Sequence, residues 1–187
     1  QYATKGYLEK LIAQVFTGRE RFEPGNPQEG YSPSPQERQS WLQISYMKEA
    51  YHTMGPKFTL GWMAEALYSS KNFSENYTAT MMQAGEFAPT PHSKLMYNEA
   101  FRANQYVAAG IKPIYVLNDM FQFRTEFYGF TPIFPIKKNA LNKAYYGKAF
   151  SRFEYMGEVS VICHLPFGAI SAYVNHYSSP RREWNVG

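Results

Sequence analysis

The stretch that decides the fold is YGKAFSRFEYMGEVSVICHLPFGAISAYVNHY, residues Tyr146–Tyr177. Polar and apolar side chains alternate before its Leu-Pro-Phe-Gly turn and again after it. Successive side chains of a strand point to opposite faces, so the pattern predicts a β-hairpin with one polar and one apolar face. The first limb would run for about 20 residues, against about five to six in an ordinary strand. Such a long, two-sided strand is typical of a membrane-spanning β-barrel.

The composition favours a membrane barrel over other classes of protein. Hydrophobic residues make up 44% of the chain and charged residues 18%, which excludes a disordered chain. The mean hydropathy is -0.47 and no stretch approaches the roughly 18 apolar residues of a membrane helix, which excludes a helical membrane protein. A barrel strand escapes that test because every second residue can be polar. Aromatic residues reach 18%, which fits aromatic girdles at both membrane interfaces.

The charged residues and the cysteine point to no other class. The net charge is +4, and the Lys and Arg residues are scattered, whereas nucleic-acid binding requires a basic stripe. We therefore expect no nucleic-acid partner. The single cysteine, Cys163, cannot form an internal disulfide and lies on the apolar side of its strand, where a small inert residue is expected. Without an initiator Met or a signal peptide at Gln1, the sequence is expected to be a mature or excised piece.

Other extended segments precede and follow the hairpin. The first has imperfect alternation and would also suit a helix, but we expect a strand there. An eighth strand is expected to begin at Trp184–Gly187 and to be truncated. The predicted upstream strands are Tyr7–Thr17, Ser40–Thr53, Lys57–Ser69, Ala103–Leu117 and Met120–Ile133.

The connections alternate between long and short. Outer-membrane barrels keep short turns at the periplasmic end and longer loops outside. The segment 70–102 could hold helical turns at Asn76–Ala84 and Ser93–Arg102, and we expect it to fold over or into the barrel mouth. The predicted long surface loops are 18–39, 70–102 and 135–145, and the predicted short periplasmic turns are 54–56, 118–119 and 166–168.

These patterns predict an all-β fold. Residues 1–187 would form a single antiparallel transmembrane β-barrel segment, with about seven complete strands and the truncated eighth. That number does not close a barrel of the usual even strand count, and an open edge in lipid would leave backbone groups unpaired. The remaining strands of a larger barrel are therefore expected partners.

Three phrases of the sequence carry a resemblance to a known family. They are NYTATMMQAGEFAPTPHSKLMYNEAFRANQYVAAGIKPIY (Asn76–Tyr115), FQFRTEFYGFTPI (Phe121–Ile133) and VSVICHLPFGAISAYVNHY (Val159–Tyr177). They resemble the C-terminal β-barrel of bacterial patatin-like phospholipases, which is similar to the surface-antigen (BamA/TamA-like) outer-membrane protein superfamily. The most telling pieces are the Pro89–Ser93 loop and the Leu-Pro-Phe-Gly turn. The resemblance implies the C-terminal half of a sixteen-stranded barrel in the bacterial outer membrane.

The resemblance also implies that the chemistry lies elsewhere in a parent protein. In that family a separate N-terminal patatin domain carries a Gly-x-Ser-x-Gly nucleophile and an Asp. This chain has no such motif, and its one Asp, Asp119, falls in a predicted turn. We therefore expect no catalytic residue and no cofactor here, although a parent could carry a patatin-like lipid acyl hydrolase domain. The histidines His52, His92, His164 and His176 lack metal-ligand spacing, so no metal site is expected either.

Charged residues on the predicted polar faces have two interpretations. They could line a selective pore, or they could form cross-strand ion pairs that fill a partly plugged interior. The second is favoured because both signs are mixed and no single-sign ring appears. The predicted lumen-facing polar network comprises Glu49, Glu65, Arg124, Glu126, Lys148, Arg152, Glu154 and Glu158. The predicted membrane-interface aromatics, placed by their position towards strand ends, are Trp41, Trp62, Tyr68, Tyr115, Tyr146, Tyr177 and Trp184.

Three functional hypotheses follow. The first is an outer-membrane β-barrel segment that acts as membrane anchor or translocation pore for a patatin-like phospholipase or assembly-factor-like parent, with outer-membrane lipid and the parent's N-terminal domain as partners. The second is a soluble β-barrel or sandwich that binds an apolar ligand. These two differ in the direction of the apolar face, outward in a membrane barrel and inward in a lipocalin-like one. The third is a barrel-wall acyltransferase or esterase with a Ser–His pair that involves His92 or His164.

Overall fold

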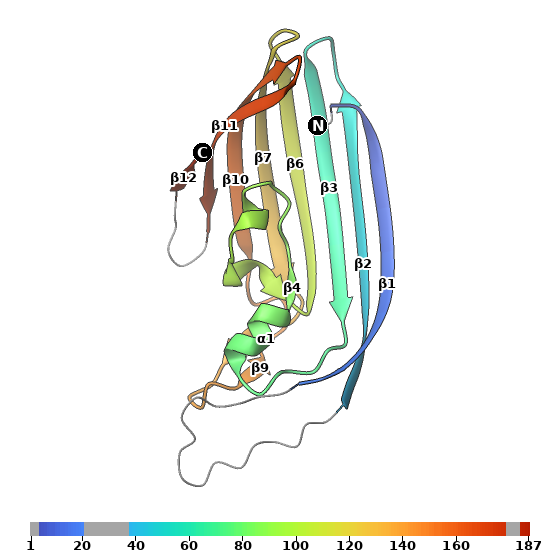
Figure 1. The fold of residues 1–187 in the computed structure, drawn as a ribbon, viewed down its shortest axis with the longest axis vertical. Coiled ribbons are helices and arrows are strands. Elements are labelled where there is room, and N and C mark those ends of the chain that lie inside the picture. Colours follow the sequence, from blue (N-terminus) through green and yellow to red (C-terminus); the bar gives the residue numbers. More distant parts are fainter. Residues whose placement is uncertain (1–3, 21–37, 179–183) are drawn as a thin grey trace.

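The computed structural model describes residues 4–20, 38–178 and 184–187, and one large antiparallel sheet dominates it (Figure 1). Eight strands pair in the order β1-β2-β3-β6-β7-β10-β11-β12. The prediction of an all-β antiparallel fold is confirmed. The strands are β1 (Gly6–Arg19), β2 (Arg38–Thr53), β3 (Phe58–Ser69), β6 (Gln105–Val116), β7 (Phe121–Pro132), β10 (Glu154–Leu165), β11 (Gly168–Tyr177) and β12 (Trp184–Val186).

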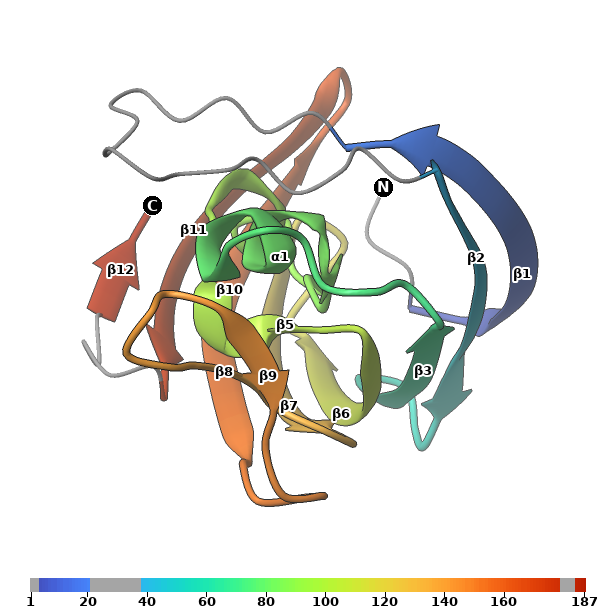
Figure 2. The ribbon, with the colours of Figure 1, turned by 90° about the horizontal axis from the view of Figure 1, so that it is seen from below.

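The sheet is strongly curved. Viewed along the strands, it bends around the chain segment 70–104, which lies inside the curve (Figure 2). We call the side towards this segment the concave face and the opposite side the convex face. Within the described ranges the sheet is open, because its edge strands β1 and β12 are not paired with each other.

Short and long connections lie at opposite ends of the strands. Residues 54–57, 117–120 and 166–167 join neighbouring strands at one end, at the top of Figure 1. In the second of these turns the Asn118 side chain accepts hydrogen bonds from the backbone N–H groups of Met120 and Phe121, at 2.9 and 2.8 Å. The connections 70–104 and 133–153 lie at the other end, which we call the long-loop end. Most of the predicted loop 18–39 lies outside the described residues.

The segment 70–104 is built from short elements. It contains α1 (Tyr77–Gln83), two 3₁₀ turns η1 (Ser93–Leu95) and η2 (Glu99–Phe101), and a small pair of strands β4 (Gly85–Glu86) and β5 (Arg102–Ala103). Asn76 caps α1, because its side chain accepts a hydrogen bond from the Ala79 N–H at 2.8 Å. This helix confirms the helical turn predicted at Asn76–Ala84. The helical turn predicted at Ser93–Arg102 is instead two short 3₁₀ turns.

Aromatic side chains hold this segment against the concave face. Phe87 and Phe101 are 0% and 1% exposed. The Phe87 ring lies 5.9 Å from that of Phe130 on β7 and 6.2 Å from that of Tyr106 on β6, between ring centroids. The Phe101 ring lies 6.0 Å from that of Tyr177 on β11. The segment therefore shares one core with the sheet and covers part of its concave face.

The expected long first limb of the Tyr146–Tyr177 hairpin is not one strand, so that prediction was wrong. β10 begins only at Glu154. Upstream, β9 (Ala144–Tyr146) pairs with β8 (Ile136–Lys138) in a separate hairpin. Between β9 and β10, Phe150 adopts a φ of 51°, in the left-handed region that interrupts an extended strand. The alternation is broken there, because the apolar Phe150 falls in phase with Lys148 and Arg152, and the chain leaves the sheet.

Candidate functional site: the two faces of the sheet

The convex face exposes a broad apolar surface. Residues paired across neighbouring strands share a face, and here Trp62, Ile111 and Phe127 form one such row across β3, β6 and β7. Monomeric soluble proteins rarely expose contiguous apolar patches beyond a few hundred Å². The exposed large apolar residues of this face include Leu11, Val15, Leu42, Ile44, Phe58, Val107, Ile111, Tyr115, Phe123, Phe127, Tyr155, Val159, Ile170 and Val174.

A polar cluster interrupts this surface close to the β1 edge. The Lys48 ammonium lies 3.3 Å from the Glu9 carboxylate, and the Tyr46 hydroxyl donates a hydrogen bond to the same carboxylate at 2.7 Å. The charges are therefore paired with each other rather than isolated on the apolar face.

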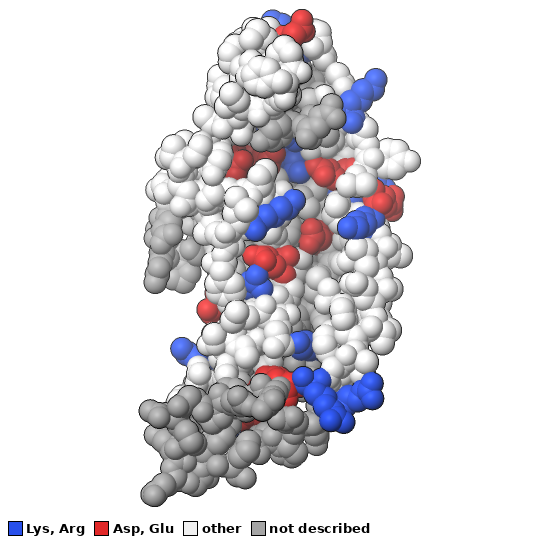
Figure 3. Space-filling view, in the orientation of Figure 1, with Lys and Arg blue, Asp and Glu red and all other residues white. Residues whose placement is uncertain are grey.

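The concave face carries a network of ions that connects β2, β6 and β7. Lys112 lies 2.5 Å from Glu49, which also accepts a hydrogen bond from Tyr51. Arg124 donates to the Tyr51 hydroxyl at 2.9 Å and to Glu126 at 2.7 Å. Cations and carboxylates alternate through these contacts, and charges of both signs are intermixed on the face seen in Figure 3. The arrangement is a set of satisfied ion pairs and not a single-sign ring.

Glycines make room for the two tyrosines of this network. Tyr51 pairs across strands with Gly61, and Tyr128, which donates a hydrogen bond to Glu126, pairs with Gly110. A Cβ atom added at Gly61 would lie 2.7 Å from the Tyr51 ring, and one added at Gly110 would collide with the Tyr128 ring. Each ring thus lies flat over a glycine, a device that covers backbone on curved sheets. This lets Tyr51 reach past β3 to its partners.

The structure places most predicted lumen-facing residues on the concave face. Glu65 accepts a hydrogen bond from the Tyr106 hydroxyl at 2.6 Å. Two residues lie off the sheet. Lys148 is exposed in the β9–β10 connection, away from the network. Arg152 precedes β10, but it still contacts the interior, because it donates to the Ala100 carbonyl oxygen at 2.9 Å and lies 3.8 Å from Glu154. Those on the concave face are Glu49, Glu65, Arg124, Glu126, Glu154 and Glu158.

Sequence reasoning missed three members of the network, Lys112, Tyr51 and Tyr128. Their signal was available in part. The alternation within β6 puts Lys112 in phase with the buried Tyr106 and opposite to the exposed Ile111. No sequence pattern, however, pairs Lys112 with a carboxylate two strands away.

The predicted interface aromatics divide between the faces. Trp62, Tyr68, Tyr115 and Trp184 pair with convex-face residues. The other three correct the prediction, because alternation or chain path puts them elsewhere. Trp41 lies on the concave face, where its ring stacks on that of Phe16. Tyr177 is only 2% exposed, beneath the segment 70–104. Tyr146 lies off the main sheet in β9, and its hydroxyl accepts a hydrogen bond from the Asn104 side chain at 3.1 Å.

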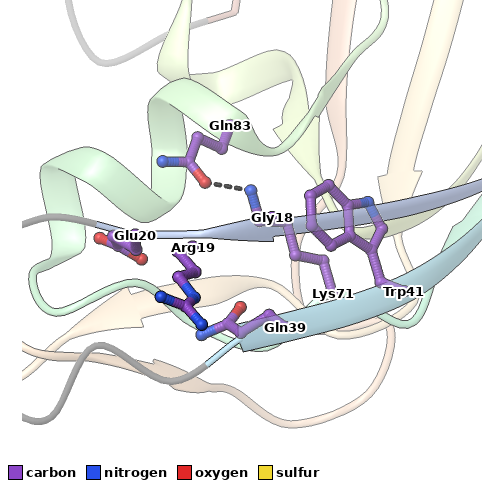
Figure 4. Close-up of a pocket in the computed structure, with 7 residues that line it drawn as sticks. All are labelled: Gly18, Arg19, Glu20, Gln39, Trp41, Lys71 and Gln83. Carbon is purple, nitrogen blue, oxygen red and sulfur yellow. Dashed lines mark hydrogen bonds between the residues drawn. The ribbon is translucent and has the colours of Figure 1, made fainter.

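A cavity of about 230 Å³ lies at the long-loop end, between β1, β2 and the segment 70–104 (Figure 4). The Lys71 ammonium lies 4.5 Å from the centroid of the Trp41 ring and donates a hydrogen bond to Gln83. Burial lowers the pKa of Lys71, and the Glu20 carboxylate opposes this shift. These contacts fasten the end of α1 to β2, and Arg19 lines the same cavity.

Two of the four histidines, His52 and His92, make side-chain hydrogen bonds to aromatic residues. The His92 ring nitrogen Nδ1 lies 2.9 Å from the Tyr177 hydroxyl, and the Trp62 N–H donates to His52 at 3.3 Å. Among the described residues, no group of three or more His, Cys, Asp or Glu side chains could hold a metal ion. In the same part of the chain, no helix has the length and apolarity needed to cross a membrane.

Comparison with known proteins identifies no protein similar to this chain. No protein-family model, no curated protein and no solved structure matches this chain. The resemblance to the barrels of patatin-like phospholipases therefore stays a prediction.

Proposed function

We propose that this chain is a section of an outer-membrane β-barrel wall that anchors a larger parent protein in the lipid. In this proposal the convex face contacts lipid chains and the concave face looks into the barrel interior. The observation that carries the proposal is the inverted sidedness of the sheet, with ions buried on one face and large apolar side chains exposed on the other.

Strand β7 presents this inversion most clearly. Arg124 and Glu126 are 4% and 7% exposed, whereas Phe123 and Phe127 are 46% and 53% exposed. In water, burial of apolar side chains is favourable and burial of charge is costly, so a soluble sheet would favour the opposite arrangement. Contact with lipid removes the conflict, because the phenylalanines then lie in an apolar solvent.

The same observations disfavour a soluble barrel that binds an apolar ligand. Such a protein would turn its apolar side chains inward around the ligand. Here the concave face holds the ion network and is covered in part by the segment 70–104, as described above. The large apolar side chains that are exposed lie on the other side, and those of the concave face are covered by the segment 70–104.

An anchor fits better than an open translocation pore. The segment 70–104 packs Phe87 and Phe101 into one core with the sheet, so it occupies space inside the curve. The concave charges are paired with each other rather than arranged as a ring of one sign. The identity of the parent, patatin-like or assembly-factor-like, rests on the sequence resemblance.

Two arginine substitutions on β7 test the proposal in the full-length protein. Phe127→Arg places a charge in the middle of the strand, where lipid contact makes it cost about 2–4 kcal/mol, and Phe121→Arg places one at the strand end, where the cost is about 0–1 kcal/mol. Both residues lie on the convex face and are exposed. Stability is measured by denaturant unfolding in lipid vesicles, together with the shift of the unheated protein on gels.

Two results would contradict the proposal. The first is recovery of the full-length protein in the aqueous phase without detergent and with no heat-dependent gel shift. The second is an equal, negligible effect of both arginines, which is what a water-exposed surface would give.

A further inference from the structure

The connection between β7 and β10 is basic throughout. Residues 133–153 contain five Lys or Arg residues and no Asp or Glu. The β8–β9 pairing sets Lys137 opposite Tyr145 and Lys138 opposite Ala144, so the connection projects as a hairpin at the long-loop end (Figure 2). We call residues 133–153 the basic hairpin.

The lysines of the basic hairpin are exposed and largely without acidic partners. Lys137, Lys138, Lys143 and Lys148 are all exposed. Within the described ranges, their one ion pair joins Lys143 to Glu75 at 3.9 Å. Arg152 is different, because backbone carbonyl groups and Glu154 engage it. Lys137, Lys138 and Lys148 are therefore available to an external anion, and Lys143 is exposed with one ion-pair contact to Glu75.

Exposed aromatic side chains accompany these lysines. Tyr145, Phe150 and Phe153 are 45%, 61% and 65% exposed. A Cβ atom built at Gly129 would lie 3.0 Å from the Phe153 ring, so this ring lies on β7 at the margin of the convex apolar surface. Aromatic rings at headgroup depth, with lysines just beyond them, are the arrangement found where a protein leaves the lipid.

We propose that the basic hairpin binds the phosphate groups of anionic lipid headgroups at the membrane surface. This inference rests on the proposed membrane function and adds its lipid class. Its chemistry is complementary, since four exposed ammonium groups face a layer of phosphates and the adjoining rings contact the upper acyl chains. A nucleic acid would satisfy the lysines too, but it would leave the rings and their continuity with the convex face without a role.

Matched pairs of lysine substitutions test the inference. The full-length protein is folded in zwitterionic detergent and titrated with phosphatidylglycerol or phosphatidylcholine, and native mass spectrometry gives the dissociation constants. Each lysine near an anionic surface contributes roughly fivefold, so Lys137→Gln/Lys148→Gln should weaken phosphatidylglycerol binding by roughly 25-fold and leave phosphatidylcholine binding unchanged. The control is Lys5→Gln/Lys57→Gln, which removes the same charge from exposed positions at the opposite end of the strands and should change binding by less than about twofold.

The outcomes separate this inference from the proposed function. Heat-dependent gel migration of the same preparations reports on barrel formation, so a folded barrel with equal affinity for both lipids overturns the headgroup inference alone. Equal weakening by both double variants overturns it as well, because general charge would then explain the effect. Full competition by inorganic phosphate at constant ionic strength would identify a free-phosphate site instead of a lipid site. Tight binding of a labelled oligonucleotide that requires Lys137 and Lys148 would assign the hairpin to nucleic acid and refute the lipid assignment.

Discussion

Removal of Lys112 should destabilise the protein by leaving the Glu49 carboxylate without its cation. The two side chains are 7% and 20% exposed, and their charged atoms lie 2.5 Å apart. At an effective dielectric constant of about 20 the gross attraction is about 7 kcal/mol, most of which offsets the desolvation of the two ions. Breaking a buried pair by loss of one partner costs about 3–5 kcal/mol. Because Glu49 retains the hydrogen bond from Tyr51, we expect Lys112→Met to cost about 3 kcal/mol, at the lower end of that range.

A double-mutant cycle separates the ion pair from other effects of the substitution. Reversible denaturant unfolding in lipid vesicles gives the free energies for Lys112→Met, Glu49→Gln and the combined variant. The combined variant should be more stable than Lys112→Met alone, because it leaves no uncompensated carboxylate. A cost below about 1 kcal/mol for Lys112→Met, or strictly additive effects, would refute the reasoning, because either result would mean that water or another cation neutralises Glu49.

Two further predictions concern packing on the concave face. Gly110→Ala should destabilise the protein by about 1–3 kcal/mol in the same unfolding assay, because its Cβ atom would collide with the Tyr128 ring and lie 2.7 Å from a backbone oxygen on β7. The control Gly168→Ala should have almost no effect, since a Cβ atom there would have no atom within 4 Å. Equal effects of the two substitutions would show that the Tyr128 ring is free to move. Phe87→Ala should lower the free energy of unfolding by about 3–5 kcal/mol and make the segment 70–104 accessible to limited proteolysis. The control Met82→Ala, at a 65% exposed position, should leave the cleavage pattern unchanged. Resistance of the Phe87 variant to the protease would mean that other contacts hold the segment in place.

The alternation of polar and apolar residues predicted where most strands lie, but it did not predict where a strand is interrupted. β2, β3, β6 and β7 agree with the predicted strands to within about two residues at each end. The prediction failed at residues 146–153, where Phe150 and Ser151 break the alternation and the left-handed φ of Phe150 turns the chain out of the sheet. Period-two alternation reports which side chains differ in environment, and it does not report whether the backbone remains hydrogen-bonded to a neighbouring strand.

In the ion network, too, the face of each residue could be predicted from the sequence, but its contacts across strands could not. Membership of the polar face could be derived for Arg124, Glu126 and Glu158, since each lies in phase within its own strand. The contacts of Lys112 with Glu49 could not, because residues 63 positions apart meet only through the register of three paired strands. Tyr177 was predicted as a membrane-interface aromatic from its place at a strand end, whereas the structure buries it beneath the segment 70–104.

The sequence by itself determined that the chain forms long, two-sided antiparallel strands joined by short turns, because side-chain alternation and turn residues act over a few neighbouring positions. Only the tertiary structure decided which face is which. Curvature of the sheet and the packing of Phe87 and Phe101 define the concave face, and with it the burial of the ions and the exposure of the apolar residues. Alternation separates the two faces of a strand but does not indicate which face is buried, so the direction of the apolar face depends on contacts between residues far apart in the chain.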